Sequence, residues 1–583
     1  MRRHGVIRRY LRRGAARRAV LVAAVLLVVV STGLSGAPVA AGQIDAGPVT
    51  TLVSAVQASD GSRHTITNHL TPLARQSGER TGPRREYLLV WAGDEEANSA
   101  STPDPDFLAV IDATRGPRYG KVINTVTIDS IFGNEPHHMQ YAWHKGQRVY
   151  AGGMFSDTTY IFDVSRLPVV TLSGVKIAAD TPCGSVPDAY QVLKDGTAYG
   201  TYMGGPDVAG ACTYTDGAVR IGNGFAGSPG EIVHLGPDGK VLAEAPASST
   251  EPERATCQNL PALPTPTCAN PHGIAVREDL NRMVTSDLAE ISHTINQVPP
   301  PDLINSRDTV RVFDISRRND PKLLSVSYLP EGPRPAPEWW LNEHWAAMET
   351  AVTNQPRHRG AFSATMGGAV YYTPDITVRH PQWREVFDDA TGFASMYPGA
   401  GVTSLPDGGA WLQVSPDDRY LYHVATAGGP EGKGMLFVLD IRRLLASGSR
   451  TTCSIDAAPE MTAGGSEPEC PKLVSAAPIG GGPHWGAYDN FRPGPDGRYR
   501  ETTDIGRIVT TNYFVAATGF DGDHRVCMFD LDSHGTLSLD EAFRDEYNGQ
   551  PCIDFNRTSW PHGNTGHARP HGLLFTVADA DLR

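Results

Sequence analysis

One short pattern recurs along this chain and constrains its fold more than any other feature. A histidine, usually preceded by proline, stands at the start of a short apolar run that is typical of a β-strand. The pattern occurs at His137-His138, His272, His344, His484 and His571. Counted from His137, the separations are 135, 72, 140 and 87 residues, close to one or two multiples of a period of about 70 residues. A long fixed period indicates a repeat architecture.

Two strand starts without histidine complete the period. They are the runs 188–192, which begins at Asp188, and 410–414, which contains Trp411, and they bring the number of repeats to seven. Within the repeats the expected strands come in groups of four, and the third ends in an apolar run closed by aspartate, at Asp163, Asp314, Asp440 and Asp530. Groups of four strands at this period are typical of propeller blades. The predicted fold class is all-β, a seven-bladed β-propeller; two stacked β-sandwiches are the alternative, but they would not explain a single period.

The last repeat has too few residues for a blade of its own. After His571 there is room for one strand, whereas three strand-like runs near the other end, 87–92, 107–112 and 122–128, belong to no histidine-headed repeat. We therefore expect the N-terminal strands to complete the last blade and close the ring, which hides strand edges that an open sheet would expose. The propeller is predicted to span residues 85–583. Residues 42–84 are polar and without a clear pattern, and are predicted to be an N-terminal leader.

The first 41 residues have the composition of an export signal. Eight arginines and no acidic residue precede an apolar run over 19–30, and small residues follow up to Ala41. This predicts a signal peptide over 1–41, a secreted or extracytoplasmic protein, and no stable membrane insertion after cleavage, because the run is too short to span a bilayer comfortably. Cleavage would take the formal net charge from −13 to −21. So acidic a protein is not expected to have nucleic acid as a partner.

The eight cysteines fall as four neighbouring pairs. An even count in an exported protein favours disulfide bonds. We expect sequential pairing, because each bond then closes a local loop: Cys183–Cys212, Cys257–Cys268, Cys453–Cys470 and Cys527–Cys552. No Cys-x-x-Cys spacing occurs, so a structural zinc site or a thioredoxin-type redox centre is not supported.

The repeated histidines predict a metal site. In a propeller the first strand of each blade lines the central axis, so residues at corresponding positions converge. Imidazole is the commonest protein ligand of copper, zinc and iron. We therefore expect one transition metal held by three or four imidazoles, drawn from His137, His138, His272, His344, His484 and His571. Which of His137 and His138 is the ligand stays open. The alternative is that Pro-His is only a strand-entry dipeptide inherited by repeat duplication.

Carboxylates near the histidines are candidates for proton transfer. Glu135 and Glu343 lie one or two residues before their histidines, where they would accept an imidazole N–H or carry a proton, unless they are solvated turn residues. A separate stretch, 530–541, has the spacing of an EF-hand calcium loop except at His534. Because a strand rather than a helix is expected before it, we interpret it as a strand-to-turn connection, with calcium as the alternative.

Several segments taken together resemble the selenium-binding protein / methanethiol oxidase family. They are the His137-His138 pair and the runs at 107–112, 120–123, 160–164, 415–422 and 481–483. The resemblance covers most of the chain from Tyr87 onward. It implies a seven-bladed propeller, a copper site made by histidines, and oxidation of small thiols with oxygen. The cysteines that follow the His-His pair in animal members are absent, and Trp143-His144-Lys145 stands there instead, which puts selenium binding in doubt.

The leading hypothesis is a secreted copper-dependent oxidase of small thiols such as methanethiol, with oxygen as co-substrate. Copper is favoured by the resemblance and by the preference of imidazole sites for Cu(II) over other divalent ions. One alternative is an iron oxygenase similar to the carotenoid-cleaving propellers, which also use axial histidines. Another is a non-catalytic propeller that binds a protein or cell-wall partner. Metal content separates the first two, and absence of metal favours the third. The sequence leaves the oligomeric state open.

Overall fold

The computed structural model describes residues 48–583 except for 76–83, 95–104, 130–133, 255–256, 258, 297–305, 335–341, 391, 393–407, 427–433, 456–467 and 516–519. The predicted signal peptide, 1–41, lies outside the described residues. The compact unit Gln43–Arg583 contains the whole fold described below. No helix among the described residues is long and apolar enough to cross a membrane.

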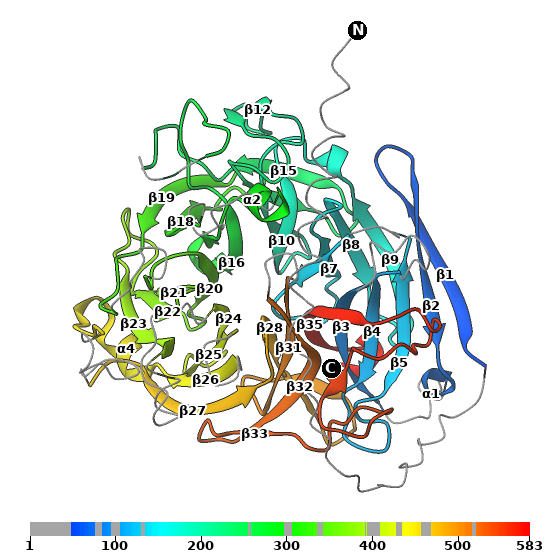
Figure 1. The fold of residues 1–583 in the computed structure, drawn as a ribbon. Coiled ribbons are helices and arrows are strands. Elements are labelled where there is room, and N and C mark those ends of the chain that lie inside the picture. The colour runs from blue at the N-terminus through cyan, green and yellow to red at the C-terminus, as the bar shows by residue number, and fades with distance from the viewer. Residues whose placement is uncertain are drawn as a thin grey trace, which may run out of the picture. The chain divides into compact units, whose positions relative to one another are not determined.

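Seven antiparallel sheets follow one another round a ring, so the chain is a seven-bladed β-propeller (Figure 1). We number the blades in chain order. The strands of blades 1 to 3 are β6 (Pro136–Met139), β7 (Val149–Gly153), β8 (Thr158–Asp163) and β9 (Thr171–Lys176); β10 (Ser185–Val192), β11 (Ala198–Gly204), β14 (Glu231–Leu235) and β15 (Val241–Pro246); and β16 (Pro271–Arg277), β17 (Arg282–Asp287), β18 (Thr309–Asp314) and β19 (Lys322–Tyr328).

The next three blades repeat the arrangement. Their strands are β20 (Ala347–Val352), β21 (Ala361–Thr365), β22 (Ala369–Thr373) and β23 (Arg384–Asp388); β24 (Gly409–Val414), β25 (Tyr420–Ala425), β26 (Gly434–Asp440) and β27 (Lys472–Ile479); and β28 (Trp485–Tyr488), β31 (Arg507–Val515), β32 (Phe520–Leu531) and β33 (Leu537–Leu539), with β34 (Ile553–Asp554) also paired to β32. Two small hairpins, β12 (Gly210–Thr213) with β13 (Val219–Gly222) and β29 (Phe491–Pro493) with β30 (Tyr499–Glu501), lie outside these sheets. The α-helices are short: α1 (Pro72–Arg75), α2 (Ile291–Asn296) and α4 (Arg442–Ser447).

The aspartates that close the third strands act as turn residues. The side chain of Asp163 accepts a hydrogen bond from the backbone N–H two residues on, at 2.9 Å, and Asp314 and Asp440 do the same at 2.8 and 3.1 Å. The carboxylate thus replaces the strand partner that the backbone loses at the turn. The repeated marker therefore has one structural cause at these three aspartates, whereas Asp530, the fourth, pairs with Arg115.

The seventh blade joins the two ends of the propeller and closes the ring, as predicted. β35 (Ala568–Val577) pairs antiparallel with β3 (Glu86–Asp94), from Glu86 opposite Val577 to Asp94 opposite Ala568. β4 (Phe107–Asp112) and β5 (Val122–Ile128) follow outward. In Figure 1 the red C-terminal strand β35 lies beside the blue strand β3. The closing contact is therefore a full backbone ladder.

Residues 50–70 of the expected leader at 42–84 are instead part of this blade. β1 (Thr50–Gln57) and β2 (Arg63–Leu70) form a hairpin that adds two strands to the outer edge, through pairing of β2 with β5. The segment lacks an apolar pattern because hydrogen bonds, as well as apolar burial, hold it. Buried Asn68 donates to the carbonyl of Val170 at 2.8 Å and accepts from its N–H at 2.9 Å, as another strand would.

The four sequential disulfides are present. Their Cα–Cα distances are 5.5 Å for Cys183–Cys212, 5.4 Å for Cys257–Cys268, 5.0 Å for Cys453–Cys470 and 4.4 Å for Cys527–Cys552, all within the usual range for a disulfide. Such bonds persist in oxidising compartments, which fits an extracytoplasmic protein.

Candidate metal centre

A β-bulge at the same place in most first strands delivers the site residues. The register of the first strand shifts by one residue in six of the seven blades: between Pro136 and Met139, Pro187 and Tyr190, Pro271 and Ile274, Ala347 and Glu349, Gly409 and Leu412, and opposite Val90 and Ala92 in β35. A bulge leaves one residue unpaired and redirects its side chain. Proline suits the first position, because it has no N–H to offer the ladder. This explains the recurring Pro-His.

Five imidazoles come together, four of them from bulged first strands and His484 from the position just before β28, which has no bulge. Neighbouring first strands contact one another round the ring. His137, His138, His272 and His484 each offer a ligand atom within 4.8 Å of the others. His571 joins them, with ring centroids 4.1 Å from His137 and 4.6 Å from His484. Each of the five is at most 2 % exposed. Both members of the His137-His138 pair lie in the group, so each of them is in place to be a ligand.

Two carboxylates that the sequence analysis did not select belong to the same group. Asp188 Oδ1 lies 2.9 Å from His137 Nε2 and 3.2 Å from His138 Nδ1. Glu349 Oε1 lies 3.2 Å from His272 Nδ1. The sequence carried a signal for Asp188, because Pro187-Asp188 repeats the proline of the Pro-His pairs with aspartate in place of histidine.

His344 lies outside this group, which corrects its placement among the axial ligands. Its Nδ1 is 2.8 Å from Asn342 Oδ1, and its ring packs on Trp345 at 4.7 Å. Burial lowers its pKa to about 4. The physical reason is register: the first strand of blade 4 begins at Ala347, three residues after His344, so the residue that reaches the site is Glu349, five residues after the apparent repeat position.

The two glutamates proposed from the sequence lie in different surroundings. Glu135 is partly buried, its Oε1 accepts a hydrogen bond from the Tyr513 hydroxyl at 2.8 Å, and loss of solvation raises its pKa. The Tyr513 ring meets His571 edge-on at 5.5 Å, so Glu135 reaches the histidine group through one tyrosine. Glu343 belongs to a separate group of carboxylates in blade 4.

Aromatic side chains wall the imidazole group. Trp485 stacks on His138 at 4.1 Å, and Phe514 lies 4.4 Å from His484. Tyr141 packs on Trp485 at 4.9 Å, and its hydroxyl donates to Glu349 Oε2 at 2.5 Å. The site thus has nitrogen and carboxylate groups at its centre and apolar rings around them.

The burial of the site keeps most of its imidazoles neutral. Burial lowers the pKa of His137, and lowers that of His138, His484 and His571 further, with neighbouring imidazoles adding to the effect in those three. Burial also acts to lower the pKa of His272, but the negative charges of Asp188 and Glu349 outweigh burial and raise that pKa. Neutral imidazole is the form that binds metals.

The ring nitrogens fit a bound metal ion. His272 Nδ1 lies 2.8 Å from the Met348 carbonyl, which leaves Nε2 to face the group, and Nε2 has no hydrogen-bond partner among the described residues. Neither ring nitrogen of His571 has such a partner in the described part of the chain. His138 Nε2 and His484 Nε2 stand 2.6 Å apart. Buried polar atoms are normally paired, and one cation would satisfy several of these at once. The group can therefore hold a metal ion through nitrogen.

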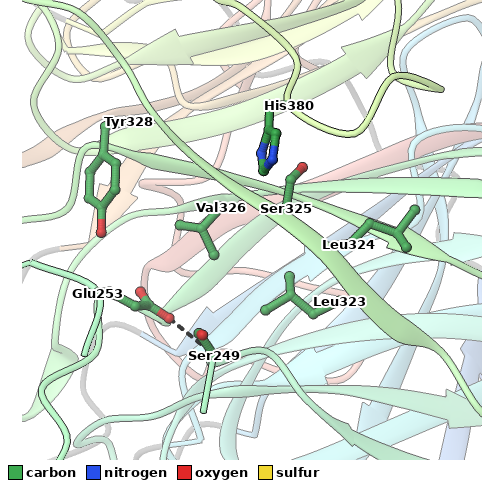
Figure 2. Close-up of a pocket in the computed structure, with 8 residues that line it drawn as sticks. All are labelled: Ser249, Glu253, Leu323, Leu324, Ser325, Val326, Tyr328 and His380. Carbon is green, nitrogen blue, oxygen red and sulfur yellow. Dashed lines mark hydrogen bonds between the residues drawn. The ribbon is translucent and has the colours of Figure 1, made fainter. Parts of the chain in front are cut away.

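A surface pocket of about 310 Å³ offers no comparable chemistry. It lies against β19, along Leu323, Leu324, Ser325, Val326 and Tyr328, with Ser249, Glu253 and His380 opposite (Figure 2). The carboxylate of Glu253 is held by Arg311 at 2.7 Å and accepts the backbone N–H of Ser249 at 3.0 Å. Its charge is already satisfied, so the axial group remains the candidate site.

The stretch 530–541 forms the strand-to-turn connection expected from the sequence. β32 ends at Leu531, and Asp532 Oδ1 accepts the backbone N–H groups of His534 and Thr536, both at 2.8 Å. Asp530 pairs with Arg115. The acidic side chains that a calcium loop would use thus shape a turn and bind an arginine.

Comparison with known proteins gives a likeness of fold. No family model matches the sequence, and no curated protein matches it. Among solved structures, a hypothetical selenium-binding protein from Sulfolobus tokodaii is 14% identical with a TM-score of 0.51, over 86% of this chain and 95% of that one. A periplasmic gluconolactonase from Pseudomonas aeruginosa is 13% identical with a TM-score of 0.43, over 84% and 99%. The propeller therefore has a weak, fold-level link to a selenium-binding protein.

Proposed function

We propose that this chain is a secreted, metal-dependent oxidoreductase that oxidises small thiols such as methanethiol with molecular oxygen, and that its metal is copper. The observation that carries the proposal is the buried group of five histidines at the axis, of which four offer ligand atoms within 4.8 Å of one another.

The metal would be held by nitrogen. His272 would bind through Nε2, because its Nδ1 faces Met348 and Glu349, and His138 and His484 would bind through the Nε2 atoms that already face each other. His137 and His571 border the same space and supply a fourth ligand. Imidazole sites bind copper more tightly than other divalent first-row metals. Bound there, copper would supply one-electron redox chemistry and lower the pKa of a coordinated thiol.

The protein's own groups orient the ligands and receive the substrate proton. Asp188 and Glu349 face ring nitrogens of three histidines and fix which nitrogen points inward. These two carboxylates are the nearest acceptors for the proton that a thiol gives up. Glu135 stays our candidate proton carrier at the border of the site, where it accepts a hydrogen bond from Tyr513, whose ring packs against His571.

The walls of the site favour a small, uncharged substrate. Trp485, Phe514 and Tyr141 surround the imidazoles, and all three are buried. A charged group would have to give up its hydration in such surroundings, which costs several kcal/mol or more. A methyl group has no such hydration to lose. Methanethiol therefore fits better than a charged thiol such as cysteine or glutathione.

Oxygen uptake by the purified, metal-replete protein tests the proposal. We expect uptake with methanethiol, much slower uptake with glutathione, and loss of activity in His272→Ala. His344→Ala is the matched control, because His344 is a buried histidine at the start of another repeat and lies outside the imidazole group. This variant should stay active. A protein that holds its metal but consumes no oxygen with any small thiol would overturn the proposed chemistry. Bound iron in place of copper would favour the oxygenase alternative.

A further inference from the structure

Blade 4 contains a second group of ligand-type side chains, made of carboxylates only. Glu343, in the loop before β20, meets Glu385 and Asp388 from the outer strand β23, and their oxygen atoms lie within 4.8 Å of one another. Glu343 and Asp388 are fully buried and Glu385 is 7 % exposed. Glutamate and aspartate are almost never buried to this extent without a partner.

A β-bulge places two of the three carboxylates on one face. In a regular strand, residues three apart point to opposite faces. In β23, however, Glu385 lies opposite Tyr371 while Phe387 lies opposite Val370, so Val386 is the extra residue. The bulge therefore turns Glu385 and Asp388 to the same side. Gly332 borders them so closely that a Cβ there would overlap both glutamate side chains.

Arg334 neutralises one of the three negative charges. Its Nε lies 3.1 Å from Asp388 Oδ2 and 3.7 Å from Glu343 Oε1, and its backbone N–H donates to Glu343 Oε1 at 2.5 Å. Both oxygens of Glu385 and Oε2 of Glu343 have no hydrogen-bond partner among the described residues. Besides Arg334, Glu343 and Glu385 have no cationic partner among the described residues, in a place where an unpaired charge is costly.

We propose that Glu343, Glu385 and Asp388 bind one divalent cation, calcium, which ties the loop before β20 to β23. Oxygen-only ligands select hard cations, and calcium accepts irregular arrangements of carboxylates that magnesium does not. The two charges left over after Arg334 equal the charge of the ion. This site is chemically distinct from the nitrogen-rich axial group, so the two can be tested independently.

The test compares the full-length purified protein after EGTA treatment and after addition of calcium. We expect one calcium ion per chain by titration calorimetry, and a rise of the melting temperature by about 2 °C or more at saturating calcium. Glu385→Gln should lower calcium affinity by about tenfold or more, because charge count sets affinity in such sites. The transition-metal content at the axis should stay unchanged in that variant.

Two matched variants make the test specific. Glu231→Gln changes another buried glutamate whose oxygens lack hydrogen-bond partners in the described residues, and Asp532→Asn changes the turn at 530–541. Both should keep the calcium effect. The proposal fails if the parent protein binds no calcium, or if its melting temperature is the same in EGTA and in calcium. Both measurements use the parent protein alone. The proposal also fails if Glu385→Gln binds calcium like the parent, or if Asp532→Asn abolishes binding.

Discussion

At the scale of single residues, Glu349 connects the imidazole group to its surroundings. One carboxylate oxygen lies 3.2 Å from His272 Nδ1, and the other accepts the Tyr141 hydroxyl at 2.5 Å. Tyr141 in turn accepts the backbone N–H of Ile274, in the same strand as His272. The carboxylate therefore contacts the His272 ring directly and its strand through Tyr141. These contacts fix the orientation of His272 Nε2, as outer carboxylates do for other histidine ligands.

Replacing Glu349 by glutamine should weaken metal binding while preserving the fold. Glutamine keeps the shape and can still accept from Tyr141, but it lacks the charge that favours a proton on His272 Nδ1. We expect metal affinity to fall by about 10- to 100-fold, the usual effect of losing such a partner. Competition with a chromogenic chelator measures it. Glu135→Gln serves as control, since Glu135 contacts the group only through Tyr513, and equal affinities in all three proteins would contradict this role.

The five histidines of the site could be predicted from the sequence, and Pro187-Asp188 carried a signal for Asp188, whereas nothing in the sequence indicated Glu349. The repeat position identified His137, His138, His272, His484 and His571 because each shares one place in its blade. Glu349 was missed because the one-residue bulge and the late start of β20 shift blade 4 out of the apparent register. Such a shift depends on backbone pairing between strands, which no single run of residues encodes.

At the scale of elements, polar side-chain contacts add to the backbone pairing that holds the β1–β2 hairpin against β5, and they also join it to the loop before β9 of blade 1. Asn68 bonds the backbone of Val170, and Asn124 donates to Asn68 at 2.9 Å. His69 Nε2 lies 3.1 Å from Thr127 Oγ1. Burial, and then the charge of nearby His562, lower the pKa of His69 to about 4. Polar residues that pair across strands do not produce the apolar alternation by which a strand is recognised, so the sequence did not predict this hairpin.

The hairpin should loosen in mild acid. The ordinary pKa of histidine is about 6.5, so above that pH His69 is neutral both folded and unfolded. As the pH falls from 6.5 to about 4, only the unfolded state takes up the proton, and stability is lost across this window. We expect a loss of roughly 1 kcal/mol, well below what the full pKa shift would give, because the ring is partly exposed to solvent. Denaturation at pH 7 and pH 5 should show a smaller loss in His69→Gln; identical losses would contradict the assignment.

At the scale of the whole molecule, one blade shared by both ends of the propeller holds the ring closed. β35 pairs with β3 along its length and supplies His571 to the axis. The period of the repeats made this closure predictable, because it is a property of the entire chain and does not depend on any local register. The number of blades and the order of the last sheet followed from it.

Removing residues 571–583 should therefore unfold the protein or lower its melting temperature steeply. The deletion takes away the first strand of the seventh blade and exposes the ladder edge of β3. A deletion of β1, through Gln57, is the matched control: it also shortens one end, but β1 is an edge strand with exposed side chains such as Val53. Calorimetry measures the melting temperature of both deletion variants. A C-terminal deletion with the same melting temperature as the control would contradict ring closure.

The metal content of the purified protein tests the central claim most directly. Elemental analysis should find one transition metal ion per chain, copper by our proposal, in the parent protein and in His344→Ala. Occupancy should fall to near zero in His484→Ala, because His484 faces His138 across the group at 2.6 Å. A parent protein that contains no transition metal after reconstitution, or full occupancy in His484→Ala, would contradict the account.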